Sequence, residues 1–163
     1  MTPIILTTCT NRKRHEPSES LRARNLQRDI LEQVAANWWH AVQVAETSFL
    51  STDLYCGRSF REACLAAEGI GSDLFVISAG LGLVDFGQEI PAYDLTLSQT
   101  SEDFIKRKII EPIDDAEWWT AVNKARGAAT PIADMIRYNT DNMVLIAGSE
   151  RYIRLISDDL NSL

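Results

Sequence analysis

The sequence predicts an α/β fold of three layers, in which helices cover both faces of a mainly parallel central sheet. Three short apolar runs, at residues 4–9, 74–77 and 143–147, have the character of buried parallel strands. Segments whose apolar residues recur at helical spacing separate these runs, and such alternation is typical of α/β domains. A length of 163 residues fits one domain. We expect it to span residues 1–163, as a small protein or as one domain of a longer one.

The first half of the chain pairs a short strand with a long helical segment. The apolar run at residues 4–9 is followed by a polar loop at residues 10–20. From Leu26 to Ala45 apolar residues recur every three or four positions, which predicts one long helix or two joined helices over about residues 20–46.

Further helices are expected on both sides of the second strand. Ser59 and Glu62 have the spacing of a capping box, and Gly69 suits a helix end, so a helix is predicted between them. Beyond the strand, residues 101–110 predict a short helix and residues 114–124 a longer one.

The last part of the chain predicts one strand between two helices. Thr130 followed by Pro131 is typical of a helix start, and this helix should reach about Tyr138. The strand at residues 143–147 then leads through Gly148 and Ser149 into a final helix. Parallel strands end at one edge of a sheet, where α/β folds place their ligands. The segments after the three strands, at residues 9–14, 78–94 and 148–149, should therefore surround one crevice.

Composition narrows the class of protein. Apolar residues make up 45% of the chain, and no apolar run approaches the ~20 residues of a membrane span, so no membrane partner is expected. The first residues lack the basic flank and long apolar stretch of a signal peptide. The three cysteines are an odd number without zinc-site spacing, and we interpret them as reduced thiols in a cytoplasmic protein.

Positive charge gathers near the N-terminus of an acidic chain. The formal net charge is −7, yet residues 11–28 hold six basic residues against two acidic ones and carry +4, which leaves −11 elsewhere. We name this segment the basic strip and expect it to seat a phosphate or a short stretch of DNA or tRNA. For Arg22, Arg24 and Arg28 the alternative is a solvated helix face, whereas Arg12, Lys13 and Arg14 directly follow a strand. The basic residues are Arg12, Lys13, Arg14, Arg22, Arg24 and Arg28.

Three residues could carry chemistry. Cys9 ends a strand and precedes basic residues that favour a thiolate, although a small buried residue would fit the same place. Asp94 could act as a general acid or base, or cap the following turn. Tyr93 could stack on a planar ligand or close the core.

The segment after the second strand is rich in small residues. Ser78, Gly80 and Gly82 would let the backbone turn tightly and approach a ligand. Ser149 could offer its hydroxyl to an anion or cap the last helix. Only two histidines are present, which argues against a histidine metal site, and no nucleotide-binding glycine motif is present, so neither a metal nor a cofactor is predicted.

Two similar tryptophan segments occur in predicted helices. Residues 36–42 and 116–122 match at five of seven positions, including both tryptophans. The match does not extend outward, so we interpret Trp38, Trp39, Trp118 and Trp119 as packing anchors. One indole of each pair is expected to be partly exposed at a surface for a protein partner.

Several motifs together resemble the YaaA-like superfamily. The resemblance rests on Ile77–Val84 followed by Ile90–Leu97, on the Cys-x-x-x-Lys start at residues 9–13, and on the Leu-Tyr segment at residues 54–63. Gly148, Ser149 and Tyr152 after the third strand also fit, so the resemblance covers most of the chain in order. It adds Tyr55 and Arg58 to the candidate ligand-binding residues, beside Arg12 and Lys13.

The resemblance implies a uracil-glycosylase-like, Rossmann-like fold and an enzyme that recognises a nucleobase or nucleotide. Similar proteins serve nucleic-acid modification, repair, phage defence or stress response, and include archaeosine synthases and enzymes of 7-deazaguanine DNA modification. Cys9 would then be a nucleophile toward a nitrile or amidine carbon, or Asp94 would activate water for glycosidic cleavage. The alternatives are a non-catalytic nucleotide- or DNA-binding module, a subunit of a larger complex, and a nucleoside transferase.

Overall fold

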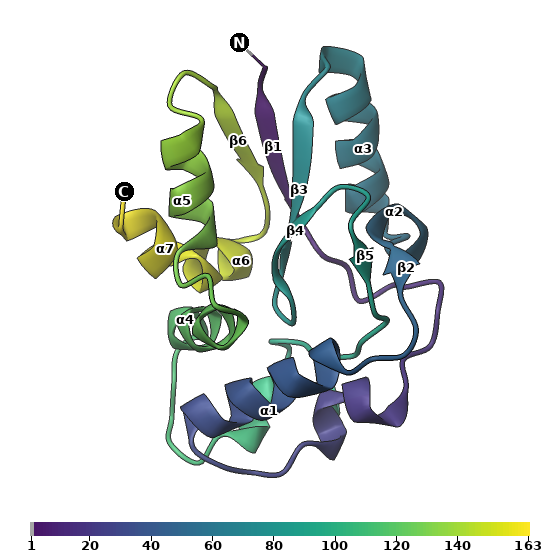
Figure 1. The fold of residues 1–163 in the computed structure, drawn as a ribbon, viewed down its shortest axis with the longest axis vertical. Helices are drawn as coiled ribbons and strands as arrows, with labels where there is room; N and C mark the ends of the chain where they lie inside the picture. The colour runs from purple at the N-terminus through teal and green to yellow at the C-terminus, as the bar shows by residue number, and fades with distance from the viewer. Residues whose placement is uncertain (1) are drawn as a thin grey trace.

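A computed structural model describes residues 2–163 and contains a four-stranded sheet in the order β4-β3-β1-β6 (Figure 1). Strand β1 (Ile4–Thr8) lies between β3 (Asp73–Ser78) and β6 (Val144–Ala147) and is parallel to both. Strand β4 (Gly82–Asp85) returns antiparallel beside β3. The predicted α/β class with a mainly parallel sheet is therefore confirmed, and so are the three predicted strands.

Helices flank the sheet and close its carboxyl end. Helix α3 (Arg58–Ile70) covers one side, and three shorter helices lie on the other side (Figure 1). Helices α1 and α4 pack together below the carboxyl ends of the strands. The remaining bounds are α1 (Leu31–Gln43), α4 (Asp115–Arg126), α5 (Pro131–Tyr138), α6 (Glu150–Leu155) and α7 (Ser157–Asn161).

Short elements fill the connections. Strands β2 (Phe49–Leu50) and β5 (Glu89–Ile90) pair as a small antiparallel ribbon. A single helical turn, α2 (Ser51–Leu54), follows β2. Three 3₁₀ turns complete the secondary structure, namely η1 (Glu19–Leu21), η2 (Ala23–Asn25) and η3 (Ile105–Lys108).

The long helix predicted over residues 20–46 is only half present. Its second half is α1, whereas the first half forms 3₁₀ turns and extended chain. The backbone there bonds to a distant segment instead of to itself: the Ala23 N–H donates to the Asp94 carbonyl at 2.8 Å, and the Asp29 N–H donates to the Lys108 carbonyl at 3.0 Å. Tertiary pairing thus overrides the local helical spacing.

Other helix ends also differ from the prediction. Helix α3 begins after Gly57 and ends at Gly71, which has a φ of 63°, so neither the capping box at Ser59 nor a stop at Gly69 is used. The helix predicted over residues 101–110 is a single 3₁₀ turn, because the Ile105 N–H donates to the Thr96 carbonyl across the chain. The last predicted helix is divided into α6 and α7.

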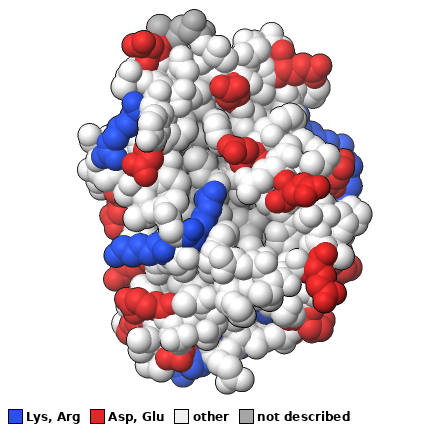
Figure 2. All heavy atoms as spheres, viewed as in Figure 1, with Lys and Arg blue, Asp and Glu red and all other residues white. Residues whose placement is uncertain are grey.

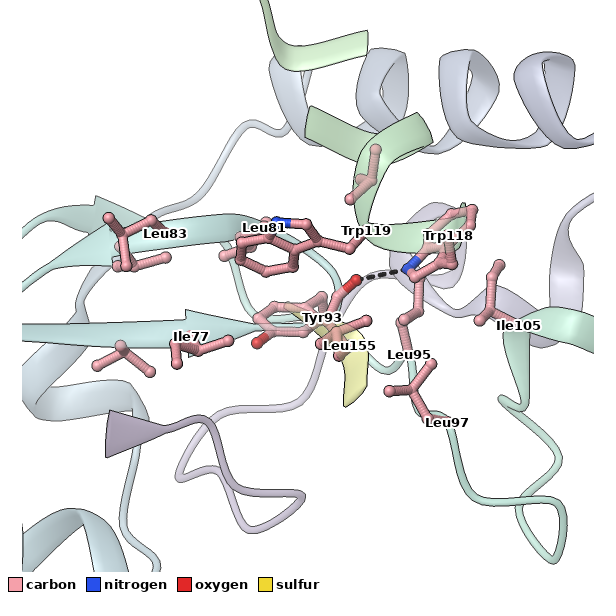
Figure 3. Packing of buried hydrophobic residues seen from close by; sticks show 14 of the residues in the cluster. Ile77, Leu81, Leu83, Tyr93, Leu95, Leu97, Ile105, Trp118, Trp119 and Leu155 are labelled. Atoms are coloured by element: carbon pink, nitrogen blue, oxygen red, sulfur yellow. Dashed lines mark hydrogen bonds between the residues drawn. The ribbon is translucent and has the colours of Figure 1, made fainter. Parts of the chain in front are cut away.

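Two indoles hold the turn between β3 and β4. The Trp38 Nε1–H donates to the Gly80 carbonyl, and the Trp118 Nε1–H, whose bond is drawn in Figure 3, donates to the Ala79 carbonyl, each at 2.7 Å. A buried indole needs an acceptor for its N–H, and these carbonyls supply it. The two tryptophan helices therefore fix the backbone beyond the central strand.

The tryptophans are packing anchors, as predicted, but they offer little surface to a partner. Trp38, Trp118 and Trp119 are fully buried, and only Trp39 is half-buried. Figure 3 shows Trp118 and Trp119 beside Tyr93 and the leucines that follow it, all within the main core. Three of the four indoles are thus unavailable to a protein partner.

Gly80→Ala is expected to destabilise the protein by about 1–3 kcal/mol, as overpacking of a tight core does. A Cβ at this position would lie 2.9 Å from two atoms of the Tyr93 ring and 3.3 Å from Trp38, and both rings are buried. Urea denaturation measures the loss. Gly69→Ala is the matched control: its Cβ would meet nothing within 4 Å, and an alanine inside α3 should stabilise by roughly 0.5–1 kcal/mol. Equal effects at both glycines would contradict this packing.

Candidate functional site

Two adjoining cavities open at the carboxyl end of β1. One has a volume of about 130 Å³ and the other about 170 Å³, and both are lined by Asn11 and Thr96. We name them together the Lys13 cleft. The first cavity is also lined by Lys13, Asp94, Leu95, Ser101 and Asp103, and the second by Cys9, Leu97, Ser98, Arg151 and Tyr152.

Lys13 is a desolvated amine at the base of this cleft. Its backbone pairs with Tyr55 in an antiparallel bridge, which directs the loop after β1 across the core. Its Nζ lies 4.2 Å from the centroid of the Tyr93 ring. Burial lowers the pKa of Lys13 below its usual value, and the electrostatic influence of the neighbouring Cys9 and Asp94 only partly offsets this effect.

The nearby carboxylates are already engaged by arginines. The Arg22 Nη1 donates to the Asp94 Oδ2 at 2.7 Å. The Arg24 backbone N–H donates to the Asp103 Oδ1 at 3.0 Å, and its guanidinium donates to the same carboxylate. Among residues 2–163, Lys13 has no salt-bridge partner within 4.0 Å. The cleft therefore contains two cations without a counter-charge from the described chain in contact, Lys13 in the first cavity and Arg151 in the second.

A buried cluster of hydroxyls supports Lys13 from below. The Tyr93 hydroxyl is hydrogen-bonded to that of Tyr55 at 2.9 Å and to the Ser78 Oγ at 2.7 Å. The Leu81 N–H donates to the same Ser78 Oγ at 3.0 Å. Burial raises the pKa of Tyr55 and of Tyr93, so both phenols stay neutral.

The stacking role expected for Tyr93 does not fit this arrangement. The Tyr93 ring is fully buried, the Lys13 amine lies over it, and Gly80 packs against its edge. Tyr93 therefore belongs to the core, and its ring has no free face for a base. Tyr55 and Ser78 are buried as well, so neither side chain can contact a ligand directly.

Cys9 lies in the second cavity beside a tyrosine from the other end of the chain. Its Sγ and the Tyr152 hydroxyl are hydrogen-bonded at 3.0 Å. The Cys9 backbone N–H donates to the Ile77 carbonyl at 2.9 Å, which fixes the thiol at the edge of the sheet. Burial raises the pKa of Tyr152, so its hydroxyl keeps its proton next to the thiol.

The two glycines serve packing within the chain rather than approach to a ligand. Gly82 has a φ of 77°, and a Cβ there would lie 2.3 Å from the Asn123 Oδ1 on α4. Gly80 faces the Tyr93 ring in the same way. Both are buried and neither lines the Lys13 cleft, so the role expected of them at a ligand is not observed there.

Three other predicted residues lie outside the cleft. Arg12 is exposed on the loop after β1. Arg58 is exposed at the start of α3 and forms an ion pair with Glu62 at 2.7 Å. Ser149 is exposed before α6 and borders a separate groove beside α3. The predicted crevice is thus formed by the segments after β1 and β3, with Tyr152 from α6, but without Ser149.

The basic strip is partly neutralised. Arg22 contacts Glu16, Glu19 and Asp94, and Arg24 contacts Glu102 and Asp103. These two side chains are therefore committed to carboxylates and not to phosphates. Arg12, Arg14 and Arg28 remain exposed.

Sequence reasoning missed Asn11, Thr96, Asp103 and Arg151 as lining residues. A signal was present for Thr96: from Asp94 to Ser98, polar and apolar residues alternate strictly, and the polar ones border the cleft while the leucines are buried. No local pattern connects Arg151 or Asp103 with the loop after β1. Asp103, for example, is hydrogen-bonded to Arg24, which lies 79 residues earlier in the sequence.

Arg24→Gln is expected to lower stability at neutral pH, and the difference from the native protein should shrink in acid. Burial alone would raise the pKa of Asp103, but hydrogen bonds from Arg24 outweigh it and lower the pKa. Such a carboxyl group stabilises the folded protein at pH values above its unfolded pKa of about 3.9. This stabilisation is lost as the pH falls through the folded pKa. Urea denaturation at several pH values measures this. Arg107→Gln, whose guanidinium lies over Phe104, is the control; an Arg24 effect independent of pH would contradict the pairing.

Residues 2–163 contain neither a cluster of metal ligands nor a membrane-spanning helix. No group of three or more histidine, cysteine, aspartate or glutamate side chains there is arranged to hold a metal ion. The helices within the same range are too short or too polar to cross a bilayer.

Comparison with known proteins gives a family but no function. No curated protein and no solved structure matches the chain significantly. Residues 42–162 match the model of DUF6884, a family of unknown function. The matched range contains Asp94 and Tyr152 of the cleft, whereas Cys9 and Lys13 precede it. Because the match covers most of the sequence, the chain belongs to the DUF6884 family.

Proposed function

We propose that this protein is an enzyme that recognises a nucleobase or nucleotide in the Lys13 cleft, as the YaaA-like motifs imply. The observation that carries the proposal is the Lys13 amine, which is desolvated, faces a cavity and has no carboxylate in contact. An unpaired, partly buried amine favours a ligand that brings an anion or a hydrogen-bond acceptor.

The size of the cleft favours a small ligand. Its cavities of about 130 and 170 Å³ are each smaller than the ~300–1,000 Å³ typical of sites for drug-sized molecules. One base could occupy the first cavity, with its sugar or phosphate directed toward Arg151 in the second. A dinucleotide would not fit.

The polar groups suit the edge of a base. Asn11 and Thr96 lie where the two cavities meet, and they offer both donors and acceptors. The Asp94 Oδ2 is occupied by Arg22, so its other oxygen is left to accept an N–H from the ligand. The contact with Arg22 holds the Asp94 carboxylate in place as a hydrogen-bond acceptor, and the Lys13 amine supplies a hydrogen-bond donor.

Nucleophilic addition is the chemistry that the arrangement favours. Cys9 lies beside the Tyr152 hydroxyl, whose pKa burial raises, so a proton donor is next to the thiol. The Cys9 sulfur would add to an electrophilic ring or nitrile carbon as one carbon–nitrogen π bond opens, while Tyr152 donates its proton to the nitrogen and receives the thiol proton of Cys9 in its place. Water activation by Asp94 is less favoured, since Arg22 shares its charge.

The experiment is mass spectrometry of nucleosides from DNA and tRNA of cells that express the native protein, with and without phage infection. We expect one nucleoside to be gained or lost with the native protein and to remain unchanged with Cys9→Ser and Lys13→Met. Arg28→Met, an exposed change in the basic strip outside the cleft, is the matched control and should act like the native protein. Identical profiles for all folded proteins would reject an enzyme acting on nucleic-acid bases.

Nucleotide binding without catalysis is the second candidate, and the engagement of Asp94 by Arg22 favours it. In that event Cys9→Ser would keep its affinity, while Lys13→Met would lose it. Titration calorimetry with a panel of nucleoside monophosphates separates the two candidates. Affinity lost in both variants, together with an altered nucleoside in cells, would favour the enzyme.

A further inference from the structure

A second pocket lies between the end of α1, the β5 ribbon and the end of α4. Its volume is about 260 Å³, and it shares no lining residue with the Lys13 cleft. It is lined by Trp39, Val42, Ala45, Thr47, Ser48, Leu81, Gln88, Glu89, Ile90, Pro91 and Arg126. The pocket therefore combines apolar walls with one cation.

Arg126 is the unexplained group in this pocket. Its Nη1 is buried, yet it donates no hydrogen bond to any described residue, and no salt bridge of the described chain includes Arg126. Burial lowers the pKa of Arg126, and Asp85 only partly offsets this effect. A buried donor without a partner is costly, and so it calls for an explanation.

A second unpaired polar atom lies beside the first. Asn123 is fully buried; its Nδ2 donates to the Trp119 carbonyl at 2.9 Å, but its Oδ1 accepts no bond from the described residues. A Cβ on Gly82 would lie 2.3 Å from this Oδ1 and 2.8 Å from the Arg126 Nη1. Because Gly82 has no side chain, the Asn123 Oδ1 acceptor and the Arg126 Nη1 donor border the same small space.

The residues that line the pocket indicate that the body of a ligand would be apolar. Val42, Leu81 and Ile90 supply aliphatic surface, and the half-buried Trp39 adds a flat ring. Thr47 and Ser48 bring hydroxyls that bond to no other residue in the described range, whereas Glu89 is an exposed acid at the border. Among the lining residues Arg126 is the one cation and Glu89 the one acid, and Figure 2 shows basic and acidic side chains interspersed over the face drawn in Figure 1. The positive charge is thus local and suits a small anionic group.

We propose that this pocket binds a small organic anion, with its carboxylate or phosphate on Arg126 and an apolar body of about one ring against Trp39. This is a second ligand site, which goes beyond the function proposed for the Lys13 cleft. Its volume is below that of sites for drug-sized ligands, which limits the body to a single ring. A guanidinium provides the two parallel donors that both head groups accept.

The test is titration calorimetry of the native protein with benzoate and phenyl phosphate, supported by tryptophan fluorescence. We expect at least one of these anions to bind, and neutral benzamide to bind roughly tenfold more weakly or not at all. Arg126→Met should weaken binding by at least about tenfold. Lys124→Met, on the same helix but lining a different groove, should leave it unchanged.

A second variant keeps the proposal testable if Arg126→Met fails to fold. Ala45→Phe fills the pocket from its α1 side without touching the charge, and it should also abolish binding. Arg126→Met is expected to keep its melting temperature, because it removes an unpaired buried charge while retaining an apolar side chain. Binding of neither anion to the native protein, or equal binding to both variants and the native protein, would overturn the proposal.

Discussion

Replacing Asp159 with alanine is expected to lower the free energy of unfolding by about 3 kcal/mol or more, because each buried donor left without its acceptor costs roughly 1–3 kcal/mol. Asp159 lies on α7 with only 2% of its surface exposed. It accepts three hydrogen bonds, from the Trp119 Nε1–H at 3.0 Å, the Ile132 N–H at 3.1 Å and the Ala133 N–H at 2.9 Å. All three donors would lose their partner in the variant.

The role of Asp159 explains how α5 begins. Two free N–H groups of its first turn are capped by this carboxylate from 26 or more residues away, and a negative charge there also suits the positive end of the helix. Thr130, the residue before the helix, makes no side-chain cap. One carboxylate thus joins α4, α5 and α7, and its loss should loosen all three.

The measurement is urea denaturation followed by circular dichroism. Asp159→Asn retains one acceptor oxygen and should lose less stability than Asp159→Ala. Asp158→Ala, one residue earlier and exposed, is the matched control and should change stability by no more than about 0.5 kcal/mol. A loss from Asp159→Ala as small as that from the control would show that the three bonds are replaced by water.

The sequence predicts the sheet well because its strands are local apolar runs. The strand predicted at residues 74–77 is observed at Asp73–Ser78, and the one at 143–147 at Val144–Ala147. Helix α4 begins at Asp115, within one residue of the start predicted at 114, and Asp114 and Glu117 form a complete capping box there within four residues. Signals of this kind need no knowledge of the rest of the chain.

The features that the sequence does not predict depend on contacts between distant segments. The extended chain around Arg22 looks helical until its backbone pairs with Asp94, 72 residues later. The burial of Tyr93 likewise depends on Lys13 and Trp38, which arrive from separate elements. For the candidate site, Cys9, Lys13 and Asp94 were found by residue type and position, whereas Tyr152 and Asp103 required the fold.

Lys13→Met is expected to reduce the nucleoside change produced by the native protein by at least about 100-fold, the lower range for loss of a positioned catalytic or binding group. Its stability should not fall in parallel. The methionine retains an apolar stem over the Tyr93 ring, and the native amine has no carboxylate in contact to lose. Loss of function with retained stability distinguishes a ligand-binding amine from a structural one.

The pH dependence of stability separates these roles further. Burial lowers the folded pKa of Lys13 below its unfolded value of about 10.4, so the charged amine opposes folding. Native stability should therefore rise with pH from the folded pKa toward the unfolded one, since the unfolded chain binds more protons there. Lys13→Met lacks this rise, whereas Lys124→Met, an exposed change, should keep it. If Lys13→Met instead destabilises the protein equally at every pH, the amine supports the fold and the cleft loses its candidate ligand.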